Sequence, residues 1–285
     1  MAGRGGGRAE AGLTRREVRA AARRRDARRG AWVSALSTAL VLALIAAVVL
    51  SSPGWDNVRQ TFFSGAAFRD AFPDVLGGFW LDIKLFLIVE GIVLVLGLVV
   101  ALCRTTGASA LFPLRAMAVV YTDLLRGIPT ILLVYLVGFG IPALELSGVP
   151  TDPVVLGGAA LALSYSAYVA EVYRAGLDSV HPSQRSAALA VGLTERQAMR
   201  HVVLPQAVRR VVPPLLNDFI ALQKDVALVS ILGPLEAFRV AQIEASSTFN
   251  YTPLLAAAAL YLCVTIPTSR VVDRLQARSR RERTA

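Results

Sequence analysis

Long apolar stretches alternate with short polar ones along this chain. Six stretches are long and apolar enough to cross about 30 Å of hydrocarbon fully or nearly so, which takes roughly 20 helical residues. They lie near residues 31–50, 83–102, 116–141, 154–173, 211–232 and 253–269. A backbone in lipid must satisfy its own hydrogen bonds, so this pattern predicts an all-α membrane protein with about six transmembrane helices.

The ends of the chain differ in character from its middle. The first stretch, AWVSALSTALVLALIAAVVL, carries no charge, is longer than a signal-peptide core, and is followed by SSPGW without a clear cleavage site. We therefore interpret 31–50 as a retained transmembrane anchor after a basic tail at 1–30. Aromatic residues mark 51–80 as an external amphipathic segment. Residues 81–270 would form the core, and 271–285 a basic C-terminus.

The distribution of charge sets the predicted orientation. The 285 residues are 55% hydrophobic and 18% charged, with a net charge of +10. With the N-terminus in the cytoplasm, 24 of the 30 Lys and Arg residues fall on the cytoplasmic side of the six spans and three outside. This bias follows the positive-inside rule and predicts that both termini are cytoplasmic. It accounts for the basicity through lipid contact, without a nucleic-acid partner.

Ionisable residues inside the predicted spans are costly in lipid and are therefore candidates for function. Glu90 lies about two turns inside the second span and must face protein or water; helix packing and a substrate role are both open. In the third span, Asp123 and Arg126 share a helical face and are predicted to neutralise each other. Pro129 removes a backbone donor and predicts a break near 126–130, which is either structural or part of a pathway.

The fifth span is the most polar. Two polar pairs, Asn217-Asp218 and Lys224-Asp225, stand seven residues apart and so share one helical stripe. That stripe must face another helix, a subunit interface or a water-filled cavity rather than lipid. We favour pairing of these charges with each other across a dimer, with contact to cargo as the alternative.

A cytoplasmic loop at 174–210 joins the fourth and fifth spans and contains SAALAVGLTERQAMRHVVLP at 186–205. The pattern predicts two short helices: Gly192 closes the first, Thr194 and Gln197 have the capping-box spacing that starts the second, and Pro205 ends it. The loop is either a docking element for another protein or a helix lying on the membrane surface. The candidate docking residues are Ser186, Ala187, Ala188, Leu189, Gly192, Leu193, Met199 and Pro205.

Four segments together resemble a known family. They are LLRGIPT at 124–130, AYVAEVYRAGLDSV at 167–180, SQRSAALAVGL at 183–193 and VVLPQAVRRVVPPLLNDFIALQKD at 202–225. In order and spacing they resemble permease subunits of ATP-binding-cassette importers, in the polar amino-acid uptake branch, over roughly 79–270. The resemblance implies a five-span core in the plasma membrane, to which the N-terminal anchor adds a sixth span. It also implies that the cytoplasmic loop carries a coupling helix, in which Ser186 replaces the family's usual Glu.

The resemblance also implies partners. They are separate ATPase subunits, a second permease chain that is a copy or a relative, an external solute-binding protein and a polar amino acid. The two lysines, Lys84 and Lys224, lack the Gly-Lys-Ser/Thr context of a P-loop, so ATP would act on the partner. We expect no catalytic, cofactor or metal site in this chain. Two other functions stay open: an ion-gradient-coupled carrier using Glu90, Asp218 and Asp225, and a membrane scaffold without a pathway.

Overall fold

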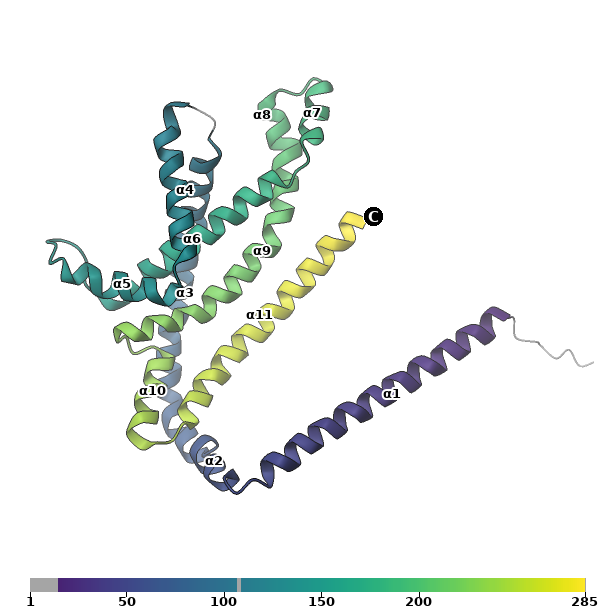
Figure 1. Ribbon diagram of the computed structural model, residues 1–285, viewed down its shortest axis with the longest axis vertical. Coiled ribbons are helices and arrows are strands. Elements are labelled where there is room, and N and C mark those ends of the chain that lie inside the picture. Colours follow the sequence, from purple (N-terminus) through teal and green to yellow (C-terminus); the bar gives the residue numbers. More distant parts are fainter. Residues whose placement is uncertain (1–14, 107–108, 285) are drawn as a thin grey trace, which may run out of the picture. The chain divides into compact units, whose positions relative to one another are not determined.

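The computed structural model describes residues 15–106 and 109–284, and all regular structure in these ranges is helical (Figure 1). By its contacts the chain divides into one unit at 1–59 and another at 60–285. The elements are α1 (Arg15–Leu50), α2 (Trp55–Phe62), α3 (Gly65–Thr105), a 3₁₀ turn (Ser109–Leu111), α4 (Phe112–Gly127), α5 (Thr130–Ala143), α6 (Pro153–Asp178), α7 (Pro182–Ala190), α8 (Glu195–Ala198), a π-helical turn (Met199–Val203), α9 (Leu204–Asp225), a 3₁₀ helix (Val226–Leu232), α10 (Ala237–Thr248) and α11 (Thr252–Thr284).

The first unit contains the predicted N-terminal anchor. Gly30–Leu50 is long and apolar enough to cross a membrane, and all of its side chains are exposed. The helix starts earlier than the apolar run, at Arg15, so the second half of the predicted basic tail is helical. Residues 1–14 of that tail lie outside the described residues. An uncharged, fully exposed helix of this length suits lipid contact on every side.

Helix α3 is longer than the second predicted span. Ser64 caps it by accepting a hydrogen bond from the Ala67 N–H (3.3 Å), and the helix then continues for 41 residues through Pro73. It therefore joins the aromatic segment predicted at 51–80 to the span predicted at 83–102. The aromatic residues from Phe68 to Trp80 lie on this helix rather than on a separate interfacial element.

Two predicted spans are broken helices. The axes of α4 and α5 differ by 108°, and the helix that ends at Leu232 meets α10 at 52°. Within the described residues, four helical stretches are long and apolar enough to span a membrane, namely Gly30–Leu50, Trp55–Thr105 (α2 and α3), Pro153–Asp178 and Thr252–Ala277. The two bent pairs raise the number to as many as six. This agrees with the prediction of about six spans.

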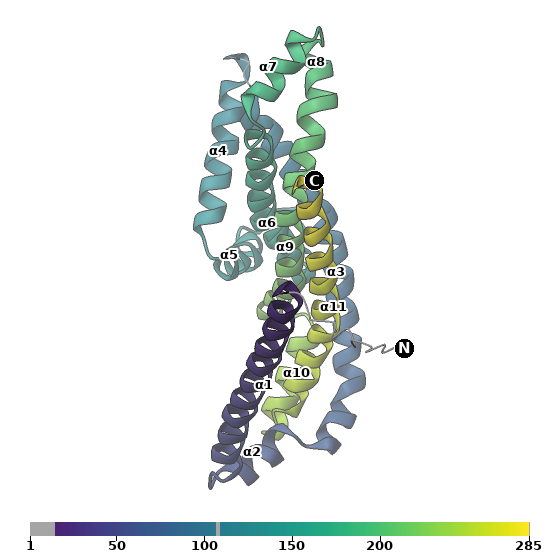
Figure 2. The same cartoon turned by 90° about the vertical axis from the view of Figure 1, so that its right-hand side faces the viewer.

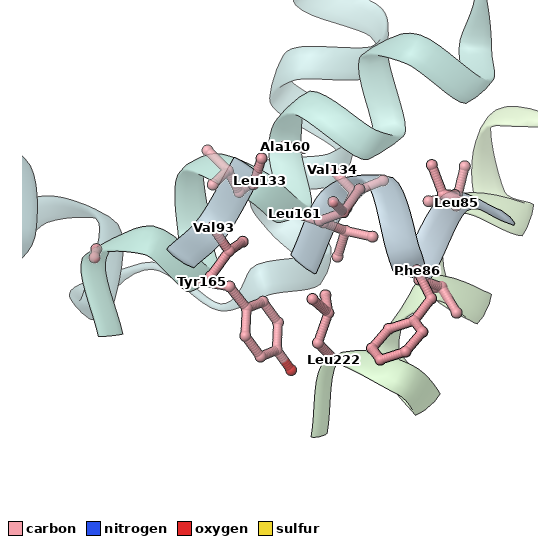
Figure 3. Packing of buried hydrophobic residues seen from close by; sticks show 14 of the residues in the cluster. Leu85, Phe86, Val93, Leu133, Val134, Ala160, Leu161, Tyr165 and Leu222 are labelled. Atoms are coloured by element: carbon pink, nitrogen blue, oxygen red, sulfur yellow. The ribbon is translucent and has the colours of Figure 1, made fainter. Parts of the chain in front are cut away.

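Helix α6 is the centre of the second unit, where it packs against α3, α4, α5 and α9. Leu161 on α6, Val134 on α5 and Leu222 on α9 are completely buried in one apolar cluster (Figure 3). Close approach is built into the contact: a Cβ at Gly157 would lie 2.5 Å from Val229 Cγ1. A side chain larger than hydrogen at 157 would therefore force the helices apart.

The functional elements lie at the ends of this bundle. Figures 1 and 2 show the α7–α8 hairpin at one end of the second unit and α10 at the other. The connecting helices α3, α6, α9 and α11 contact one another in several pairs along the way. Asp152 starts α6 by accepting hydrogen bonds from the Val154 and Val155 N–H groups (2.9 and 3.0 Å).

Candidate functional site

The predicted helical hairpin at 186–205 is present as α7 and α8. Gly192 has φ of +90°, and the Leu193 and Gly192 N–H groups donate to the carbonyl oxygens of Ala188 (3.2 Å) and Leu189 (3.0 Å). This pair of bonds is the Schellman motif that ends a helix. Thr194 then caps α8: its hydroxyl accepts from the Gln197 N–H (3.3 Å), and the Gln197 side-chain oxygen accepts from the Thr194 N–H (2.9 Å). Both predicted local signals are confirmed.

Two details of this prediction are wrong. Pro205 does not end the second helix, because a π-helical turn over Met199–Val203 leads directly into α9, with Pro205 in its first turn. Proline is tolerated there since its missing N–H and fixed φ suit a helix start. Ala188 is not part of an open surface either. It is only 5% exposed, and its carbonyl oxygen takes part in the Schellman motif.

Most of the other candidate docking residues are exposed on the hairpin. Leu189 and Met199 are 37% and 44% exposed, and Leu193 is half-buried. The exposed small residues of this set are Ser186, Ala187 and Gly192. Arg185 on α7 and Glu195 on α8 form an ion pair (2.7 Å). A cavity of about 1070 Å³ lies between the hairpin and the ends of α3 and α6. The hairpin is thus a defined, apolar and accessible element at one end of the unit.

A second candidate site is a polar cavity of about 300 Å³ between α4, α6 and α9. Arg126 contributes from α4, Tyr168 and Glu171 from α6, and Asp218 from α9. The Arg126 guanidinium lies 5.7 Å from the centre of the Tyr168 ring, within cation–π range. The cavity therefore offers both signs of charge and an aromatic face.

Glu171 is the centre of the charges around this cavity. It accepts a hydrogen bond from Arg104 on α3 (2.7 Å), lies 4.0 Å from Arg126 on α4, and pairs with Arg174 one turn along α6. Arg174 also pairs with Asp178. One carboxylate thus joins three helices, and such a network is less easily screened than an isolated surface pair.

The predicted Asp123–Arg126 ion pair is wrong. Arg126 lies in the last turn of α4 and reaches across to Glu171 on α6, while Asp123 is exposed and forms no ion pair with any described residue. Arg126 thus contacts Glu171, which already binds two other arginines, in place of the local i,i+3 partner Asp123. The predicted break at 126–130 is confirmed, with α4 ending at Gly127 and Pro129 preceding α5.

The polar stripe of the fifth span divides into two parts. Asp218 and Asp225 are half-buried and point toward the interior of the chain, whereas Asn217 and Lys224 are exposed. Asp225 accepts a hydrogen bond from the Tyr165 hydroxyl (2.7 Å), and Asp218 lines the polar cavity. The predicted pairing of these charges across a dimer stays a prediction.

Glu90 lies near this stripe. It is half-buried on α3 and close enough to Asp218 for the two carboxylates to interact electrostatically. The structure therefore brings together Glu90, Arg126 and Asp218, which the sequence places on three different spans. Asp123 and Lys224 do not join them.

Several residues in and around the polar cavity were missed by sequence reasoning. Glu171 and Arg174 stand three apart near the end of the fourth predicted span, and this spacing was an available signal. Tyr165 and Tyr168 gave none, because an aromatic residue in an apolar helix is compatible with any packed position. Within the described residues no group of three or more His, Cys, Asp or Glu side chains is arranged to hold a metal ion.

Comparison with known proteins identifies the family. Residues 93–281 match the family described as "Binding-protein-dependent transport system inner membrane component". The chain is 34% identical to the arginine transport system permease protein ArtQ of Bacillus subtilis, over 66% of this chain and 84% of that protein. It is also 34% identical to the probable glutamine ABC transporter permease protein GlnM of the same organism, over 73% and 94%.

Solved structures agree with this assignment. A crystal structure of an amino acid ABC transporter with histidines superposes with a TM-score of 0.69 at 31% identity, over 75% of this chain and 98% of that one. The MetNI methionine ABC transporter superposes at 0.54 and 20% identity over 71% and 95%, which supports the fold alone. The chain is a multi-pass membrane protein and belongs to the inner membrane components of binding-protein-dependent transport systems, together with the permease subunits of amino-acid ABC importers.

Proposed function

We propose that this chain forms the translocation pathway of an ATP-driven importer for a polar amino acid, in the plasma membrane and with both termini in the cytoplasm. The relatives named above are permeases for arginine and for glutamine, which supports an amino-acid cargo. The observation that carries the proposal is the α7–α8 hairpin, a small folded element with exposed apolar residues that joins two membrane helices. A carrier driven by an ion gradient has no need of such an element.

The hairpin is the proposed contact with a separate ATPase subunit. Leu189 and Met199 supply its exposed apolar area, and the Arg185–Glu195 pair holds α7 against α8. Closure of the ATPase subunits would displace the hairpin and tilt the attached helices α6 and α9, switching the pathway between its two open states. ATP binds to the partner in this scheme, and this chain binds no cofactor.

The polar cavity is the proposed part of the pathway in this subunit. A zwitterionic amino acid carries one carboxylate and one ammonium group, and the cavity offers an Arg126 guanidinium and an Asp218 carboxylate to such a molecule. Its volume of about 300 Å³ is at the lower end of the range for small-molecule sites. Proton or ion coupling through Glu90, Asp218 and Asp225 is the rival use of the same residues.

Further partners complete the proposed assembly. A second permease chain, identical or related, would close the pathway on its open side. An external solute-binding protein would deliver the cargo and set most of its selectivity. The exposed apolar residues of α5, among them Tyr135, Leu136 and Phe139, are available for lipid or for the second permease chain.

Reconstitution tests the proposal. The chain and its ATPase are placed in liposomes, and uptake of labelled amino acid is followed with ATP on the ATPase side. We expect uptake that needs ATP and survives collapse of the proton and sodium gradients. Uptake that follows an imposed gradient without ATP would support the carrier instead.

A paired substitution tests the hairpin contact itself. Leu189→Asp places a charge on an exposed apolar residue of the hairpin, and Val155→Asp places one on an exposed residue in the first turn of α6, away from the hairpin. We expect Leu189→Asp to prevent co-purification with the ATPase and Val155→Asp to leave it intact. Equal co-purification of both variants would show that the hairpin is not part of the contact with the ATPase.

A further inference from the structure

Two acidic side chains are buried side by side far from the hairpin. Asp82 on α3 and Glu236, the residue before α10, are each 1% exposed. The backbones approach closely here, since a Cβ at Gly78, one turn before Asp82, would lie 2.6 Å from the carbonyl carbon of Glu236. Asp82 Oδ2 accepts from the N–H of Ala237, the residue next to Glu236 (3.3 Å), so the two carboxyl groups are close enough to interact electrostatically. Neither was singled out by the sequence, because each stands alone between apolar residues.

The hydrogen bonds of this pair leave one atom without a partner. Both oxygens of Glu236 accept from backbone N–H groups, Oε2 from Phe238 (2.8 Å) and Oε1 from Arg239 (2.6 Å). Asp82 Oδ2 accepts from the Tyr261 hydroxyl (2.8 Å) and the Ala237 N–H (3.3 Å). Asp82 Oδ1 is buried and has no hydrogen-bond partner among the described residues. A buried oxygen in this state needs a donor.

The surrounding charges do not neutralise the pair. No Lys, Arg or His of the described residues forms an ion pair with Asp82 or Glu236. Tyr261 is the polar group that faces the pair from α11. On α10, Arg239 donates through Nη1 to Gln242 (2.8 Å), and its buried Nε has no partner. On α9, Lys224 shares a cavity of about 360 Å³ with Tyr261 but is itself exposed.

We propose that Asp82 and Glu236 form a binding site for a single exchangeable proton, shared between Asp82 Oδ1 and the Glu236 carboxyl group. Two carboxylates in contact and away from water cannot both remain charged. One proton gives Asp82 Oδ1 its missing partner and reduces the net charge of the pair to −1. When the proton leaves for water, the O–H bond breaks, its electron pair stays on the oxygen, and two like charges face each other inside the protein.

The position of this site gives the proton a structural role. Asp82 and Tyr261 connect α3 to α11, and the Ala237 N–H connects α3 to the start of α10. Glu236 lies within the break where the long helix from α8 bends by 52° into α10. The proton therefore holds the bend against α3, and its loss releases α10 by repulsion. This role is independent of the proposed cargo and of the hairpin contact.

Thermal unfolding as a function of pH tests the proposal in the purified full-length chain. The folded pair binds a proton that both carboxyl groups of the unfolded chain have lost at neutral pH. Stability is therefore full where the unfolded carboxyl groups are also protonated, falls as pH rises through the range in which only the folded pair holds its proton, and levels off once the folded pair has released it. While the two states differ by one whole proton, the ratio of folded to unfolded protein falls by about tenfold per pH unit.

Substitution separates this site from other titrating groups. Asp82→Asn places an amide N–H₂ where the shared proton was, so we expect its melting temperature to lose the pH dependence of the wild type. Glu236→Gln serves as a second variant, and Asp74→Asn is the matched control because Asp74 is an exposed carboxylate on the same helix. We expect the control to titrate like the wild type. The same pH profile in wild type, Asp82→Asn and Glu236→Gln would overturn the proposal.

Infrared spectroscopy keeps the test informative where a variant does not fold. A protonated carboxyl group in the folded wild type gives a C=O band that shifts in D₂O. We expect this band in the wild type and in Asp74→Asn at neutral pH, and we expect it to disappear when the pH is raised. A wild type without a protonated carboxyl band at neutral pH would contradict the shared proton.

Discussion

The Gly192→Ala variant tests the folded state of the α7–α8 hairpin without changing any other feature of the chain. Gly192 has φ of +90°, and a Cβ added there would meet nothing within 4 Å. The substitution thus causes no clash, and its cost is the left-handed backbone alone, about 1–2 kcal/mol for a residue with a side chain. That cost falls on the Schellman motif between Ala188 and Leu193. We expect local opening of the hairpin to become about five- to thirtyfold more frequent.

Hydrogen exchange measures this directly. The amides of 186–198 should exchange about five- to thirtyfold faster in Gly192→Ala than in the wild type, because exchange follows the population of the opened form. Gly148→Ala is the matched control. Gly148 also has a positive φ (+82°) and open space around it, but it lies between α5 and α6. This variant should speed exchange only around residue 148. The exchange rate at 186–198 in Gly192→Asn should lie between those of the wild type and Gly192→Ala, since Asn tolerates this conformation better than Ala.

Transport gives the functional measurement for the same variants. ATP-driven uptake should fall in Gly192→Ala and stay unchanged in Gly148→Ala, because only the first loosens the proposed ATPase contact. Two results would refute the reasoning. The first is equal exchange at 186–198 in the wild type and in Gly192→Ala. The second is faster exchange at 186–198 without any loss of uptake, which would show that transport does not depend on the folded state of the hairpin.

The remaining predictions concern packing and charge inside the second unit. Glu171→Gln removes the carboxylate shared by three arginines and should cost about 1–3 kcal/mol of stability by thermal unfolding. The control Asp178→Asn, whose side chain is 60% exposed, should cost about 0.5 kcal/mol or less. Equal costs would contradict the central role of Glu171. Gly157→Ala should cost about 1–3 kcal/mol by overpacking, and Val229→Ala should restore part of it. Gly91→Ala, in open space on α3, should be neutral or slightly stabilising, and a loss as large as that at Gly157 would show that the helix approach is unimportant.

Local patterns in the sequence identified the elements that depend on local physics. The Gly192 turn and the Thr194 capping box use only neighbouring residues, so their spacing was sufficient to predict both. The break before Pro129 follows from the missing backbone donor in the same way. Number and length of the apolar stretches predicted the spans, and the exception is α3, whose helix continues through Pro73 and joins the aromatic segment to the span.

The parts that failed depend on long-range contacts. Arg126 was paired with Asp123 because i,i+3 spacing was visible, whereas Glu171 is 45 residues away and becomes its partner only after α4 and α6 pack. Asp82 and Glu236 meet across 154 residues, with no local pattern that joins them. Pro205 was predicted to end a helix because a π-helical turn has no sequence signature as clear as a cap.

That π-helical turn makes the two arms of the hairpin mechanically unequal. On one side, Ser179, Val180 and His181 interrupt the backbone between α6 and α7. On the other, helical backbone continues without interruption from Glu195 to Leu232, which is about 55 Å at 1.5 Å per residue. A displacement of the hairpin would therefore be transmitted along the continuous helix of the second arm. The first arm would instead bend at residues 179–181. Displacement would reach the bend before α10 with less loss than it reaches the middle of α6.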